Sequence, residues 1–328
     1  APKDSWLWNV TAGASAISLG IGFLAVIWFL IRPLGILLLG LTLAAALAPV
    51  VSWFERWLSR TFATILVFLL LLLVLLGLGW IVFPILVDQA AEMIDRVPAL
   101  VDQAQVWLEE RLPITAGSTF DTVLSQITNI ASTIIALPFE ISSSILDIFL
   151  VTFLSLYTLI IAPDAQHFAL SLVSREDQSK VSDLIHSVAH AMGGYIRGAT
   201  ISGAVIGTVS YIGLLIIGVN FPLVLGIIAG ILEFIPVIGP FIAGSLMVLI
   251  AFLEAPAKAL ITLIFVVALG QLEGNIIAPN VMRPQTNISP LMTLFSIFAG
   301  WSIGGVLGAL IAIPITAALH VLAVEVIA

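Results

Sequence analysis

Long apolar runs separated by short polar stretches make up most of this chain. Crossing a bilayer as a helix takes roughly 20 apolar residues, within a range of about 17 to 25. The runs lack the strict alternation of membrane barrel strands, and lipid gives backbone groups no hydrogen-bond partner. The pattern therefore predicts helical spans near residues 10–31, 34–51, 62–86, 146–162, 199–219 and 257–278.

Arg32 and Pro33 separate the first two predicted spans. Proline disfavours a helical conformation in the residue before it, and a charged side chain prefers the membrane interface. We therefore expect a tight turn here, with the first two spans forming a hairpin. The apolar run of the first span is long and has no A-x-A-like cleavage site, so we expect a retained span rather than a signal peptide.

Two polar stretches, 87–145 and 163–197, have the periodicity of amphipathic helices. The apolar face of the first contains Val97, Leu100, Val101, Ala104 and Leu108. The apolar face of the second contains Val181, Leu184, Ile185, Val188 and Met192. We expect the first to pack on the bundle or the membrane surface, with ligand capture as the alternative, and the second to present a solvated polar face.

Two further apolar stretches, 221–253 and 289–324, contain helix-breaking residues. The first is interrupted by Glu233, Pro236, Gly239 and Pro240, and the second by Gly300, Gly304, Gly305 and Pro314. Each stretch begins near a proline. Paired interrupted helices point to a transport site in proteins with internal repeats, whereas two simply kinked spans are the alternative.

Composition supports a membrane protein, because 61% of residues are hydrophobic and 9% are charged, against about a quarter charged in soluble domains. The net charge of -8 argues against nucleic acid as a partner, and the absence of cysteine excludes disulfides and thiolate sites. His186 and His190 lack the glutamate of an H-E-x-x-H motif. We expect no metal site, no cofactor and no enzymatic activity.

The predicted fold class is an all-α, polytopic membrane helical bundle with amphipathic extramembrane helices. It divides into N-terminal membrane helices (1–86), a polar insert (87–145), a membrane helix with a cytoplasmic amphipathic helix (146–198) and a C-terminal membrane half (199–328). With a cytoplasmic N-terminus, seven of the eleven basic residues lie inside. The positive-inside rule then places both termini in the cytoplasm and the insert outside.

Isolated carboxyl and amide groups in apolar sequence are the candidate transport residues. A bare carboxylate in a membrane span is costly unless it is protonated, paired or hydrated. Proline and glycine near Glu233 free backbone carbonyl groups that could face a cavity. The candidate pathway residues are Glu233, Pro236, Gly239, Pro240, Gln271, Glu273, Asn275, Pro279 and Asn280. A helix-end glutamate and a capping role for Asn280 are the structural alternatives.

Glycine pairs with G-x-x-x-G spacing let helix backbones approach closely. The pairs are Gly203 with Gly207, Gly226 with Gly230, Gly300 with Gly304, and Gly304 with Gly308. Packing inside the chain and contact between subunits remain alternative interpretations.

The sequence resembles the autoinducer-2 exporter-like permeases of bacteria. The resemblance rests on Leu232-Glu-Phe-Ile-Pro-Val-Ile-Gly-Pro240, on Gln271-Leu-Glu-Gly-Asn275 through Pro279-Asn-Val-Met282, and on Ser289-Pro290 followed by Gly304-Gly305, Gly308 and Pro314. It implies about eight membrane segments, a location in the bacterial inner membrane and a homo-oligomer, a pentamer in this family. The functions suggested for members of this family include export of autoinducer-2 and sodium(lithium)/proton antiport.

The leading functional interpretation is a secondary carrier, because the chain has no G-x-x-x-x-G-K-[ST] loop. Its expected partners are membrane lipid and a small polar signalling molecule or metabolite, which the carrier would export. Exchange of a monovalent cation, sodium or lithium, for a proton is the alternative. Exchange requires a carboxylate that alternates between proton and cation, whereas export of a neutral solute does not. An oligomeric passive channel is the alternative from a different class.

Overall fold

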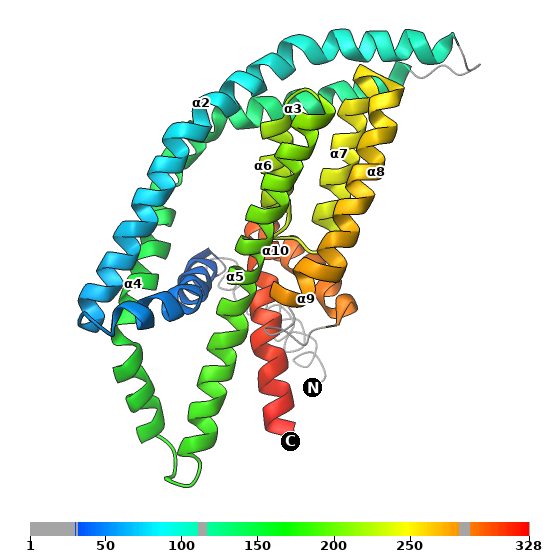
Figure 1. The fold of residues 1–328 in the computed structure, drawn as a ribbon. Coiled ribbons are helices and arrows are strands. Elements are labelled where there is room, and N and C mark those ends of the chain that lie inside the picture. The colour runs from blue at the N-terminus through cyan, green and yellow to red at the C-terminus, as the bar shows by residue number, and fades with distance from the viewer. Residues whose placement is uncertain (1–29, 31, 111–116, 282–288, 328) are drawn as a thin grey trace, which may run out of the picture.

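The computed structural model describes residues 30, 32–110, 117–281 and 289–327, which are almost entirely helical (Figure 1). In these residues, five helices are long and apolar enough to cross a membrane. They are Arg32–Phe54, Arg60–Trp107, Ile145–Ser171, Gln178–Ile217 and Pro256–Asn280. The prediction of a polytopic helical membrane protein is thereby confirmed. The predicted span 10–31 lies outside the described residues, except for Leu30, which is helical.

The predicted turn at Arg32 and Pro33 is wrong, since both residues are helical. Proline is tolerated inside membrane helices, because neighbouring groups can satisfy the carbonyl group that loses its N–H donor. Leu30 is helical as well, so the described residues before and after the pair share the helical conformation.

Helix α2, Arg60–Glu109, contains 50 residues and continues well past residue 86, where the span was predicted to end. Its length of about 75 Å, at about 1.5 Å per residue, far exceeds the bilayer core of about 30 Å. A helix satisfies its own backbone groups, so leaving the membrane does not require it to end. The helix bends in Figure 1 and contains Pro84 and Pro98.

Helix α3, Gly117–Ser143, folds back along the second half of α2. The predicted apolar face of the insert is buried here: Val97, Val101 and Ala104 belong to one core cluster with residues of α3. The same cluster includes Val224 and Met247, so the insert packs on the helix bundle, as predicted.

Helices α4, Ile145–Ser171, and α5, Gln178–Ile217, run from the membrane region into the end of the molecule opposite the insert (Figure 1). The predicted amphipathic stretch 163–197 is not a single helix: its beginning is the end of α4, which stops at Ser171, and only the part from Gln178 onward forms one continuous helix, α5, with the following span. Both halves keep their hydrogen bonds within the helix, so the change from polar to apolar surroundings does not interrupt it.

The two interrupted stretches are helical hairpins, which excludes the alternative of kinked single spans. In the first, α6 (Pro222–Leu232) and α7 (Ile238–Glu254) pack against each other. In the second, α10 (Pro290–Ile327) reverses at Gly304 and Gly305, where Gly305 has φ 58°. A Cβ atom on Gly300 would meet the carbonyl group of Gly308, and the reverse also holds, so the two arms lie in close contact.

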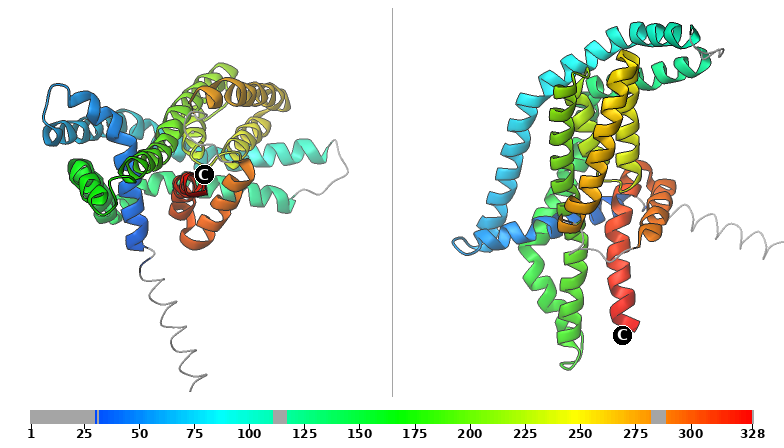
Figure 2. Two further views of the ribbon diagram at one scale, coloured as in Figure 1. Left: turned by 90° about the horizontal axis from the view of Figure 1, so that it is seen from below. Right: turned by 45° about the vertical axis from the view of Figure 1, so that its right-hand side comes forward.

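The remaining helices are α8 (Pro256–Leu272), a π-helix (Glu273–Ile277) and α9 (Ala278–Val281). Helix α8 runs alongside α7 in the views of Figures 1 and 2 and brings the π-helix to the level of the first hairpin's tip.

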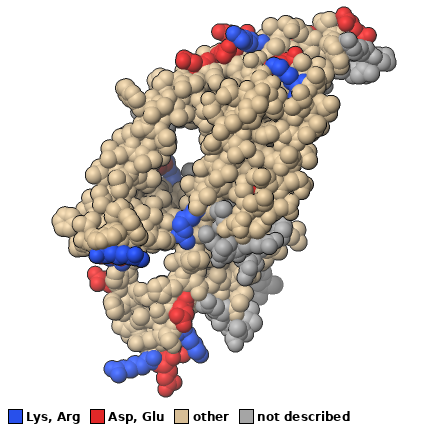
Figure 3. Space-filling view, in the orientation of Figure 1, with Lys and Arg blue, Asp and Glu red and all other residues tan. Residues whose placement is uncertain are grey.

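Charged side chains gather at the two ends of the face shown in Figure 3, over the insert and over the α4–α5 connection, and a few more Lys and Arg side chains lie between these ends. The wide middle has few charged side chains, as expected of a membrane-spanning region. The end of α10 lies with the α4–α5 connection, opposite the insert (Figure 1).

Candidate functional site

The tip of the first hairpin is a strained turn between α6 and α7. Val237 has φ 69° and ψ -55°, and the Ile238 N–H group donates to the Pro236 carbonyl oxygen at 2.8 Å. These values define a γ-turn with positive φ, a rare conformation that is unfavourable for a β-branched residue. Gly239 faces the Leu232 carbonyl group so closely that a Cβ atom would not fit. Pro236 and Gly239 thus shape the reversal that follows Glu233.

Glu233 lies at the start of this turn and is only 4% exposed. Its Oε1 atom accepts a hydrogen bond from the Ser202 hydroxyl group at 3.0 Å. Among the described residues, no N–H or O–H group donates to its Oε2 atom. A carboxyl group this buried must be neutral or stabilised by a nearby group.

The G-x-x-x-G pairs of α5 and α6 bring Ser202 within reach of Glu233. Cβ atoms added at Gly203 or Gly230 would meet the other residue's carbonyl oxygen, and Gly207 and Gly226 have the same relation. Small residues allow this close approach of two helix backbones. These glycines therefore pack within the chain.

Glu273 is the second carboxyl group of the site. It begins the π-helix after α8, and its side chain is a close electrostatic neighbour of Glu233. Two carboxylates offer only acceptor atoms, so a hydrogen bond between them requires a proton on one of the two. Neither belongs to the ion pairs of the described residues. The pair can hold a proton, or a monovalent cation in place of the proton.

The predicted amide residues lie on a more exposed surface nearby. Asn275 Nδ2 donates to the Gln271 carbonyl oxygen at 2.8 Å and to its side-chain oxygen at 3.1 Å. Asn280 Nδ2 donates to the Ile276 carbonyl oxygen at 2.7 Å. Each of these bonds is local to the π-helix region, where i→i+5 geometry disturbs the regular α-helical ladder.

The structure therefore divides the predicted site residues into two groups. One group surrounds the hairpin tip: Glu233, Pro236, Gly239 and Pro240, with Glu273 reaching it from the π-helix. The other group, at the π-helix and α9, consists of Gln271, Asn275, Pro279 and Asn280.

Two residues at the tip were not predicted from the sequence, Ser202 and Tyr195. The Tyr195 hydroxyl group donates to the Phe234 carbonyl oxygen at 2.7 Å. Ser202 directly precedes a G-x-x-x-G glycine, and Tyr195 lies three residues after Met192 on the predicted apolar face. These positions indicate burial, but they do not identify the partner across the bundle.

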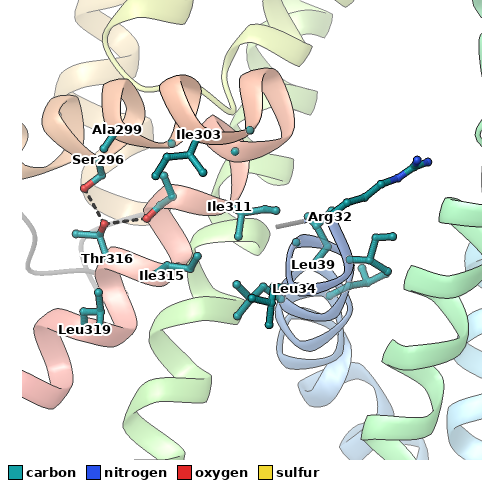
Figure 4. A pocket seen from close by; sticks show the side chains of 18 of the residues that line it. Arg32, Leu34, Leu39, Ser296, Ala299, Ile303, Ile311, Ile315, Thr316 and Leu319 are labelled. Carbon is teal, nitrogen blue, oxygen red and sulfur yellow. Dashed lines mark hydrogen bonds between the residues drawn. The ribbon is translucent and has the colours of Figure 1, made fainter. Parts of the chain in front are cut away.

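A separate cavity of about 1390 Å³ lies between the N-terminal helix, α4 and the second hairpin (Figure 4). Its walls are mostly apolar. Polar groups include the Arg32–Asp147 ion pair at 2.7 Å and the Thr316 hydroxyl group, which donates to Ser296 Oγ at 2.6 Å. None of the predicted site residues lines it. Its surface suits apolar groups, whereas the hairpin tip suits protons and cations.

Sequence comparisons cover most of the chain. A profile described as AI-2E family transporter matches residues 17–327. YueF of Bacillus subtilis (strain 168) is 27% identical over 285 residues, which cover 82% of this chain and 77% of YueF. MT0215 of Mycobacterium tuberculosis (strain CDC 1551 / Oshkosh) is 29% identical over 290 residues, which cover 85% of this chain and 79% of MT0215. The sodium-lithium/proton antiporter of Halobacillus andaensis is 24% identical over 320 residues, which cover 88% of this chain and 89% of the antiporter.

Proposed function

The chain belongs to the AI-2E transporter family, and we propose that it is a secondary carrier that exchanges protons for a monovalent cation at Glu233 and Glu273. The observation that carries this proposal is the buried carboxyl group of Glu233, which has the Ser202 hydroxyl group and the carboxyl group of the half-buried Glu273 as neighbours. A site that alternates between proton and cation needs a group that changes its charge within the membrane, and these two can do so.

The surroundings of the pair suit a small cation. The Ser202 hydroxyl oxygen can accept as well as donate, so it can turn its lone pairs toward a bound ion when Glu233 loses its proton. Carboxylate, hydroxyl and carbonyl oxygens are the ligands that hard cations prefer. Loss of the shared proton leaves one more negative charge at the tip, and a bound monovalent cation neutralises that charge.

Burial of Glu233 favours a carrier over a passive channel. At 4% exposure the carboxyl group is closed off from solvent in this conformation. A conducting pore would keep its polar groups in contact with water. Alternating access instead requires a closed site that opens to one side at a time, and helical hairpins at a repeat interface are suited to that movement.

Export of a small polar solute is the second candidate. The amide groups of Gln271, Asn275 and Asn280 favour it, because they are exposed donors and acceptors close to the site. A neutral hydroxylated solute could bind there without a change of protonation.

The test is transport by the purified protein in proteoliposomes with an imposed pH gradient. We expect sodium or lithium, added to one side, to dissipate the gradient, with little response to an impermeant organic cation. A labelled panel of polar metabolites is measured in parallel. Metabolite uptake that is independent of these cations, with no cation-driven proton movement, would replace cation exchange by solute export.

We further propose an inner-membrane location and assembly into a homo-oligomer, with five chains as the number that the family resemblance implies. Residues Leu72–Leu76 of α2 form an exposed apolar surface that another subunit could contact, since each residue is between 52% and 61% exposed. Lipid or another subunit must cover them. Native mass spectrometry in mild detergent measures the assembly, and a transporting monomer would rule out a need for it.

A further inference from the structure

We infer that Tyr195 is a positioning residue, which holds the tip of the first hairpin so that Glu233 meets Glu273 and Ser202. This inference rests on the proposed exchange at the carboxyl pair. Tyr195 does not touch either carboxyl group through an observed hydrogen bond. It acts through the backbone of Phe234, the residue after Glu233.

The hydrogen bond satisfies a backbone group that the hairpin turn leaves outside the regular helical ladder. At the tip, the Ile235 N–H group bonds the Leu232 carbonyl and the Gly239 N–H group bonds the Ile235 carbonyl. The Phe234 carbonyl oxygen between them accepts the Tyr195 hydroxyl group at 2.7 Å. A buried carbonyl group without a donor is unfavourable, so the tyrosine stabilises this arrangement of the turn.

Tyr195 and Ser202 hold the tip from one face of α5. They are seven residues apart, about two helical turns, and Ala199 between them is fully buried. Ser202 bonds the Glu233 side chain while Tyr195 bonds the backbone of the next residue. Two such bonds fix both the position and the direction of the Glu233 carboxyl group.

The tip needs this restraint because its turn is strained. A non-glycine residue with positive φ costs on the order of 1–3 kcal/mol and persists only where the surroundings impose it. Val237 is such a residue, with φ 69°. Without the Tyr195 bond, the turn can relax and carry Glu233 away from its partners.

The ring of Tyr195 also links the tip to the second hairpin. It is 4% exposed and belongs to a cluster with Ile297, Ala309 and Ile313 from the two arms of α10. Phe234 and Ile235 pack against the same cluster. A movement of α10 would therefore reach the tip through Tyr195 as well as through Phe234 and Ile235, which places Tyr195 between the two hairpins.

Tyr195→Phe tests the role because it removes the hydroxyl group and keeps the ring. In proteoliposomes we expect the sodium or lithium concentration at half-maximal rate to rise about threefold to tenfold, the range associated with one neutral hydrogen bond. The maximal rate should stay within about twofold. Tyr157→Phe is the matched control, because the Tyr157 side chain is 51% exposed on α4 and its loss should change neither value.

A second variant links the effect to the strained turn. Glycine adopts positive φ without strain, so Tyr195→Phe combined with Val237→Gly should return the half-maximal concentration toward the wild-type value. Equal half-maximal concentrations for wild type and Tyr195→Phe would overturn the inference. So would a Tyr195→Phe protein that fails to fold, since Tyr195 would then serve the core rather than the site.

Amide hydrogen exchange separates this inference from the proposed function. Tyr195→Phe should speed exchange at residues 233–239 without any added cation. If the wild-type protein moves no protons but exchange at the tip still rises, the proposed function fails and the positioning role stands. Unchanged exchange at the tip would overturn the positioning role even if the wild-type protein exchanges cations.

Discussion

Two glutamates with largely buried side chains have opposite surroundings in this chain. Glu254 is held by a salt bridge to Lys258 at 2.6 Å, and it also accepts the Asn220 N–H group at 2.7 Å. Glu233 has a hydroxyl group and a second carboxyl group as its neighbours. The first arrangement stabilises a charged carboxylate, and the second is suited to a carboxyl group that gains and loses a proton.

Substitution by glutamine should separate these two roles. Glu233→Gln and Glu273→Gln should abolish cation-driven proton movement while thermal stability stays within about 1 kcal/mol, because the amide keeps the size and much of the hydrogen bonding. Glu254→Gln should retain transport and lose about 1–3 kcal/mol, the value of hydrogen bonds to charged groups. Transport rates and detergent thermal unfolding measure both effects. Identical behaviour of Glu233→Gln and Glu254→Gln would contradict the assignment.

At the scale of helices, Arg197 of α5 contacts the helix Arg32–Phe54 at a backbone position that Pro49 leaves without a hydrogen bond. Pro49 has no N–H group, so the Ala45 carbonyl oxygen lacks its helical donor. Arg197 Nη1 donates to this oxygen at 2.9 Å and to the Ala46 carbonyl oxygen at 3.3 Å. Gly193 brings the two backbones together, since a Cβ atom there would meet Ala45. The arginine replaces the hydrogen bond that the proline removes.

A double-mutant cycle tests this connection. Arg197→Met should lower stability by about 1–3 kcal/mol, because the Ala45 carbonyl group loses its donor. In a Pro49→Ala background the same substitution should have a smaller effect, by about 0.5–2 kcal/mol, because the introduced alanine supplies the missing N–H group. Arg96→Met is the control, since Arg96 forms an exposed i,i+4 ion pair and should have little effect. Additive effects of Pro49→Ala and Arg197→Met would refute the connection.

The helices of the described residues were largely predictable, and their ends and partners were not. Apolar length predicts a span near 62–86, but nothing in the sequence requires α2 to end there, so the helix continues to Glu109. The interrupted stretches were predictable as a pair, because proline and glycine break the apolar pattern. Whether they kink or reverse depends on contacts such as Gly300 with Gly308 across the hairpin.

The site could be predicted only as separate polar groups. Glu233 and Glu273 stood out because each is a carboxyl group in apolar sequence, but they are distant along the chain and their contact depends on the hairpin and the π-helix. Ser202 and Tyr195 are ordinary buried positions until the partner helix is known. Local patterns reveal unusual residues, whereas contacts between elements are set by packing.

At the scale of the whole molecule, the insert and the end of α10 lie at opposite ends of a middle region with few charged side chains (Figures 1 and 3). We propose that the insert faces outward and the C-terminal end faces the cytoplasm, as the distribution of basic residues predicts. A cysteine at Gln103, which is exposed on the insert, should react with an impermeant maleimide added to intact cells. The chain has no native cysteine, so labelling only after permeabilisation would reverse the orientation.

The central claim is that a cation displaces a proton held by Glu233 and Glu273, and proton release on cation binding measures this directly. Sodium or lithium is added to the purified protein in weakly buffered detergent solution, and released protons are counted with a pH indicator. We expect about one proton per chain for the wild-type protein and none for Glu233→Gln or Glu273→Gln. Proton release that is undiminished in both variants, or absent in a wild-type protein that still exchanges cations, would contradict the account.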